Sequence, residues 1–338
     1  MIETPKPVTA QFNMRLAFTL AALAGLALGV ALIGYFGVDQ VSAAFTAAGW
    51  RGLAAMSAVY VVTVVLCGLA WRVIILAPPP RTTAVCCWAR YLRDSVTNLL
   101  SVVPGAGEVA AARELTIAGM ATSTASATTI VDLTVELVTQ LLFAVLGLAI
   151  LQVQRPGEPA AFWAMVALII TGAAMAGFVL AQNNGLFHIL QSLASRVGVM
   201  DKWLTPSASA NVHAAISEIY REPRRLIASV ILHFASWIVR AVEAWLALSF
   251  MGHGFAFADV LAIEGLVFAL RTVAFIVPWS VGVQEGGYVA LGAVFGLTPD
   301  VALGLSLLKR AREVITGLPC LLAWQAIETR RLWQASRN

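Results

Sequence analysis

The chain has 338 residues, of which 59% are hydrophobic and only 12% are charged, and its mean hydropathy is +0.83. A soluble domain is usually about half apolar and about a quarter charged. The composition therefore excludes an ordinary soluble protein and predicts one all-α bundle of membrane-spanning helices over residues 1–338. The net charge is +4, but Lys and Arg form no continuous basic face, so we expect no nucleic-acid binding.

Seven apolar runs are long enough to cross a bilayer, which takes roughly 20 helical residues. In chain order these predicted spans are 16–37, 52–76, 123–152, 161–182, 225–250, 257–278 and 300–327. The prolines at 78, 79 and 80 end the second span, because proline cannot continue a helix. Residues 185–222 mix polar and apolar side chains, which predicts an amphipathic helix along the cytoplasmic surface.

Lys and Arg predict the orientation, because cytoplasmic loops are enriched in both. Basic residues precede the first span and follow the last one, and they occur in the 72–93 loop, which includes Arg90 and Arg93, and in the 183–224 loop. The 38–50 and 251–256 loops contain none. We therefore expect both termini in the cytoplasm, which requires an even number of crossings, about eight.

Two further apolar stretches, 94–121 and 276–298, are interrupted by Pro and Gly and resemble each other. The first reads VVPGAGEVAAARELTIAGM over 102–120, and the second reads IVPWSVGVQEGGYVALGAVFGL over 276–297. We interpret them as an internal repeat of re-entrant elbows, although chance similarity between apolar segments is the alternative. The elbow residues are Pro104, Gly107, Gly119, Pro278, Gly282 and Gly296. Whether the two elbows are inverted relative to each other is left open.

The spacing within the proposed repeat is regular. In both stretches a glutamate lies 11 residues before the last glycine, and another glutamate, Glu136 or Glu313, lies 17 residues after it. Ionisable residues inside a membrane are costly and usually functional. Asp132, Glu136 and Gln140 are spaced by four, so they share one helix face.

Eight charged residues are therefore candidates to line a path for a polar headgroup or a proton. They are Glu108, Arg113, Asp132, Glu136, Arg271, Glu285, Arg310 and Glu313. The alternative is that these charges neutralise one another as interhelical pairs that hold the bundle together. No Cys or His spacing suits a metal ion, and no nucleotide-binding motif lies in a fitting context, so we expect no metal or cofactor.

The chain resembles the flippase-like transmembrane family related to the membrane half of lysylphosphatidylglycerol synthases. That family has an early Pro…Gly-Gly-Glu…Arg…Gly segment and a late Pro…Gly…Glu…Gly segment followed by Arg. The matching residues are Pro104, Gly107, Glu108, Arg113 and Gly119, then Pro278, Gly282, Glu285, Gly296 and Arg310, with Ala106 in place of the first glycine of the pair. AGWRGL (48–53), GLAWR (68–72), ARYLRDSVTNLL (89–100) and VDLTVELVTQLLFAVLGL (131–148) are most similar to the hopanoid-biosynthesis-associated HpnL branch.

The resemblance implies a lipid transporter rather than an enzyme, located in a bacterial inner membrane and moving hopanoids toward the outer membrane. Its implied partners are the lipid itself and proteins of lipid export or lipid synthesis. A phospholipid or aminoacylated lipid is the alternative cargo, since a neutral cargo needs fewer charges in the spans. Two other readings remain open: an intramembrane lipid-modifying enzyme with Asp132 and Glu136 as its acid–base pair, and a scaffold for a lipid-synthesis complex.

Overall fold

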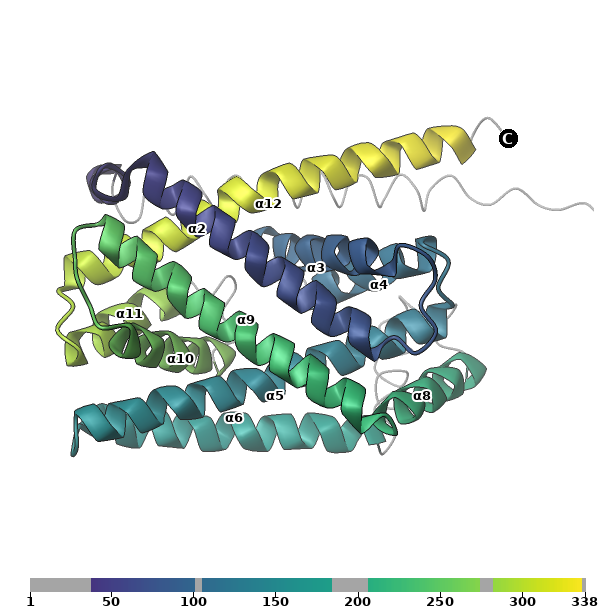
Figure 1. Cartoon of the computed structure of the whole chain (residues 1–338), viewed down its shortest axis with the longest axis horizontal. Coiled ribbons are helices and arrows are strands. Elements are labelled where there is room, and N and C mark those ends of the chain that lie inside the picture. The colour runs from purple at the N-terminus through teal and green to yellow at the C-terminus, as the bar shows by residue number, and fades with distance from the viewer. Residues whose placement is uncertain (1–37, 101–104, 184–205, 274–281, 336–338) are drawn as a thin grey trace, which may run out of the picture.

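The computed structural model describes residues 38–100, 105–183, 206–273 and 282–335. Over these ranges the chain forms ten helices and no strand (Figure 1), which confirms the all-α prediction. The helices are α2 (Val38–Ile74), α3 (Thr82–Leu99), α4 (Ala106–Ile117), α5 (Thr122–Gln154), α6 (Pro159–Asn183), α8 (Pro206–Tyr220), α9 (Pro223–Phe250), α10 (Phe257–Val273), α11 (Val283–Val294) and α12 (Pro299–Ala335).

Four of the described helices are long and apolar enough to cross a membrane. They are Ala48–Ile74 within α2, all of α5, Pro159–Gly177 within α6, and all of α9. Each coincides with a span predicted from an apolar run. The predicted span 16–37 lies outside the described residues, and only 257–273 of the predicted span 257–278 is described, as α10. The number of crossings and the orientation of the termini stay predictions.

The basic loop predicted over 72–93 is mostly helix, and this prediction is wrong. Helix α3 begins at Thr82, so only the proline-containing segment 75–81 separates it from α2. Arg90 and Arg93 are 2% and 6% exposed inside the bundle, so they cannot be counted as charges of a loop. A search for long apolar runs misses α3, because this helix carries polar residues along its length.

The bundle is held by two main apolar cores and by close helix contacts. Helices α2 and α9 pack along much of their length, as do α5 with α10 and α3 with α4 (Figure 1). The described part of the predicted amphipathic segment is α8, which packs on α5 through Val212, Ile216 and Ile219. The spacing of these buried residues is that of one helix face.

The two predicted elbow regions share their backbone geometry. Each contains a helix of 12 residues, α4 or α11, that follows a glycine with positive φ, 83° at Gly105 and 78° at Gly282. Each helix ends just before Gly119 or Gly296, whose φ values are 99° and 88°. This left-handed ending is common at helix C-termini and favours glycine, which lacks a Cβ. A 12-residue helix is only about 18 Å long, so neither helix crosses a hydrocarbon core of about 30 Å.

The position of the first break differs from the prediction. The chain turns at Gly105, whereas Gly107 lies inside α4 at a close contact with α3. A Cβ on Gly107 would lie 2.7 Å from the carbonyl oxygen of Arg93. Pro104 and Pro278 lie outside the described residues.

Candidate functional site

Most predicted path residues fall into two networks of ion pairs buried in the bundle. The first, called the α3–α5 network, consists of Arg90, Arg93, Asp94, Glu108, Asp132, Glu136, His233 and Arg240. Arg90 holds Glu136 through two bonds of 2.6 and 2.7 Å. Glu136 also lies 2.9 Å from Arg93.

Arg93 is the centre of this network. Its guanidinium lies 3.1 Å from Glu108 of α4 and 3.2 Å from Asp132 of α5. Asp132 in turn lies 3.0 Å from Nε2 of His233 on α9. One arginine therefore ties α3 to α4 and α5, and α9 is attached through a carboxylate. A carboxylate buried in this way needs its partner, because removing one member of a buried ion pair is strongly destabilising.

The second network, called the α10–α12 network, consists of Glu243, Glu264, Glu285, Lys309, Arg310, Arg312 and Glu313. Glu264 accepts bonds of 2.5 Å from both Lys309 and the hydroxyl group of Tyr288. Arg312 lies 2.9 Å from Glu243. Because Lys309, Arg310 and Arg312 all belong to α12, the network joins this helix to α9, α10 and α11.

The two repeat glutamates occupy the same place in their short helices. Glu108 and Glu285 are each the third residue of the helix, where the positive end of the helix dipole stabilises an anion. The Glu285 side chain accepts a 2.8 Å bond from the backbone N–H of Gly282 and lies 3.3 Å from Arg310. The Glu108 side chain pairs with Arg93 and is 24% exposed, compared with 4% for Glu285. The first of these acids is therefore the more accessible.

Two predicted path residues lie outside these ion pairs. Arg113 points away from the α3–α5 network, is 45% exposed, and pairs at 2.6 Å with Glu328 in the last turns of α12. Arg271 has no carboxylate within ion-pair distance over the described ranges, and its guanidinium lies 5.8 Å from the ring centre of Phe268. The charged groups that act on Arg271 include Arg240 of the first network and Glu313 of the second.

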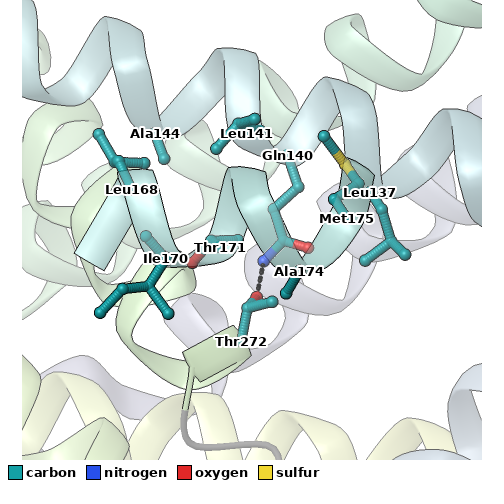
Figure 2. Close-up of a pocket in the computed structure, with 11 residues that line it drawn as sticks. Leu137, Gln140, Leu141, Ala144, Leu168, Ile170, Thr171, Ala174, Met175 and Thr272 are labelled. Atoms are coloured by element: carbon teal, nitrogen blue, oxygen red, sulfur yellow. Dashed lines mark hydrogen bonds between the residues drawn. The ribbon is translucent and has the colours of Figure 1, made fainter. Parts of the chain in front are cut away.

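A cavity of about 420 Å³ lies between α5, α6 and α10, beside the networks rather than inside them (Figure 2). Gln140, one turn after Glu136, reaches from α5 to Thr272 of α10 at its edge. Sequence reasoning placed Gln140 on the polar face of its helix but did not indicate a cavity, because a cavity depends on how three helices pack.

Sequence reasoning also missed the two arginines that organise the α3–α5 network. The count of basic residues predicts a loop around Arg90 and Arg93, although their spacing of three places them on one helix face. The alternation of apolar and polar residues over 82–99 at helical period was the signal that could have found them.

The described chain is therefore a helical membrane bundle with buried ion-pair networks and an apolar cavity. It belongs to the family described as the lysylphosphatidylglycerol synthase TM region, whose family model matches residues 22–319. Neither a curated protein nor a solved structure matches the chain. The family match confirms the predicted superfamily, and the narrower assignment to the HpnL branch stays a prediction.

Proposed function

We propose that the protein moves a lipid, specifically a hopanoid, out of a bacterial inner membrane toward the outer membrane. Membership of a family of membrane lipid proteins supports the class of function. The observation that carries the proposal is the pair of short helices, α4 and α11, whose third residues, Glu108 and Glu285, pair with arginines of neighbouring helices. Interrupted helices at matching places in two halves of a chain are typical of transporter binding sites.

The mechanism follows from the exchange of polar contacts. A lipid headgroup that enters hydrocarbon needs replacement partners for the water it loses. Arg93 and Arg310 each face more than one carboxylate, so either guanidinium can release one partner to a headgroup and keep another. The apolar body of the lipid stays in the bilayer while its polar end passes from one pair to the next.

An anionic phospholipid or aminoacylated lipid is the second candidate cargo, and Arg271 favours it. A partly buried arginine that contacts no carboxylate within the described ranges is suited to a phosphate oxygen. The carboxylates of both networks are already paired with bases, so they do not by themselves require a charged cargo.

The test measures the lipids of separated inner and outer membranes in a deletion strain. The strain is complemented with the wild type, with Glu108→Gln/Glu285→Gln, or with the control Glu218→Gln, an exposed glutamate of α8. We expect total hopanoid to be unchanged in the deletion, but lost from the outer membrane. The wild type and the control should restore it, and the double variant should not.

Three other results would decide against the proposal. A fall in total hopanoid would assign the protein to lipid synthesis, as an enzyme or a scaffold. Loss of a phospholipid from the outer membrane instead of hopanoid would support the second cargo. Full restoration by the double variant, at wild-type protein level, would remove the repeat glutamates from the mechanism.

A further inference from the structure

We infer that the cavity between α5, α6 and α10 binds an uncharged lipid whose hydroxyl group donates a hydrogen bond to Oε1 of Gln140. If the protein transports a lipid as proposed, the lipid bound here is its cargo, and the cargo is then a neutral alcohol. Only this last step rests on the proposed function. Binding itself can be measured whether or not the protein transports the lipid.

The lining of the cavity excludes a charged ligand. Eight of its eleven lining residues are apolar and none is charged, and the other three are Gln140, Thr171 and Thr272. A phosphate or ammonium group transferred there would lose its water without gaining a counter-ion, which is prohibitively costly. The volume of about 420 Å³ lies within the range of roughly 300–1,000 Å³ that is typical of small-molecule sites.

The orientation of the Gln140 amide determines what the ligand must supply. Its nitrogen lies 3.1 Å from the carbonyl oxygen of Phe268 and 2.5 Å from the hydroxyl of Thr272. A carbonyl oxygen only accepts hydrogen bonds, so the group that faces Phe268 must be the NH₂. Oε1 therefore points the other way (Figure 2) and has no hydrogen-bond partner in the described part of the chain.

The two hydroxyl groups of the cavity are already used as donors. Thr272 donates to the carbonyl oxygen of Phe268 at 3.0 Å, and Thr171 donates to that of Ala167 at 2.8 Å. The lining thus offers acceptors and no free side-chain donor, so a matching ligand must bring the hydrogen. Among uncharged lipids, an alcohol meets this requirement, whereas an ether or an ester does not.

The position of the cavity identifies its occupant as a lipid from the bilayer. Residues Pro159–Gly177 of α6 form an apolar span of which only 11% is buried. Helix α6 packs against α5 and α10 and lies at an edge of the bundle (Figure 1). Ile169 and Ile170 on α6 are 64% and 53% exposed. Because Ile170 both lines the cavity and is exposed, the cavity is continuous with the apolar outer surface of this helix. Molecules that reach Gln140 therefore come from the membrane and present an apolar body to the other lining residues.

The experiment uses the full-length protein in phosphatidylcholine nanodiscs and a photoactivatable diazirine derivative of 1-hexadecanol. Unlabelled 1-hexadecanol, hexadecyl methyl ether and hexadecyl phosphate compete for labelling. We expect labelled peptides from α5, α6 and α10, with the alcohol competing roughly three- to tenfold better than the ether, the effect of one hydrogen bond. The phosphate should compete least.

Two variants test the assignment to this cavity. Gln140→Leu should keep labelling but abolish the preference for the alcohol over the ether. Ala174→Phe fills the cavity from α6 and should reduce labelling, whereas Ala176→Phe, an exposed position of the same helix outside the cavity, should leave it unchanged. Both alanines are exposed, so these two variants can be compared at equal folded yield.

Equal competition by the alcohol and the ether, stronger competition by the phosphate, or labelling outside the three helices would each overturn the inference. The proposed transport function would still stand after any of these results, provided that the Glu108→Gln/Glu285→Gln variant fails to restore outer-membrane lipid. Conversely, alcohol-selective labelling of a protein whose deletion leaves lipid distribution unchanged would retain the site and remove the proposed function.

Discussion

Removing Arg312 should destabilise the bundle far more than removing Arg312 together with its partner. Arg312 and Glu243 are 4% and 1% exposed, and their side chains lie 2.9 Å apart. Glu243 has no other side-chain partner in the described ranges, so Arg312→Met leaves a buried carboxylate alone. The expected loss in free energy of unfolding is about 3–5 kcal/mol.

The double variant Glu243→Leu/Arg312→Met removes both charges and leaves apolar side chains of similar size. Such replacements are often neutral or stabilising. Arg312 also lies 4.4 Å from the ring centre of Tyr60, a contact worth about 0.5–2 kcal/mol, and the sulfur of methionine retains part of it. We therefore expect the double variant to lie within about 2 kcal/mol of the wild type.

The assay is reversible unfolding in mixed micelles of dodecyl maltoside and dodecyl sulfate, followed by circular dichroism or by the fluorescence of the tryptophans. Arg155→Met, at the exposed end of α5, is the control, and its effect should be within about 0.5 kcal/mol. A double variant as unstable as the single one would show that an uncompensated charge is not the cause. If the single variant loses less than about 1 kcal/mol of unfolding free energy, water reaches the ion pair.

Three further predictions concern stability in the same assay. Gly107→Val should cost at least about 1–3 kcal/mol, because its Cβ would lie 2.7 Å from the Arg93 carbonyl oxygen and force α4 away from α3. Gly119→Ala should cost about 1–2 kcal/mol, since the φ of Gly119 is 99°. The control Gly177→Ala, with open space around its Cβ position, should be neutral or slightly stabilising. An equal loss of stability at both sites would refute the argument from the backbone angle. Arg113→Gln should cost less than about 1 kcal/mol because its side chain is 45% exposed, and a larger loss would mean that this ion pair is shielded from water.

The long spans could be predicted because a bilayer imposes one requirement on all of them, a continuous apolar run. Helix α3 does not meet that requirement, since it buries Arg90 and Arg93 against carboxylates instead of presenting an apolar surface. The spacing of Glu108 and Gly119 indicated where the short helix α4 begins and ends, for a different reason. Capping and left-handed glycines act within a few residues, so they leave a local signature in the sequence.

The pairing of charges could not be predicted, because helical period gives the face of a residue but not the helix opposite it. Nothing in the sequence pairs Glu136 with Arg90, or Glu264 with Lys309, across 46 and 45 residues. Arg113 shows the limit of grouping residues by motif. It follows Glu108 by five positions, about 1.4 helical turns, so the two side chains point to different sides of α4, and only Glu108 joins the α3–α5 network.

The charge balance of the α10–α12 network has an electrical consequence. The network contains three basic side chains and the four acidic side chains of Glu243, Glu264, Glu285 and Glu313. Arg271, which lies outside its ion pairs, brings the number of basic side chains to four. A membrane potential acts on net charge, with about 2.3 kcal/mol per elementary charge at 100 mV. A movement that carries these eight side chains together displaces no net charge among them, so voltage does no work on this group. A current that accompanies turnover would therefore report charge on the cargo, on a proton or on other residues of the moving helices, and not a gating charge of these eight side chains.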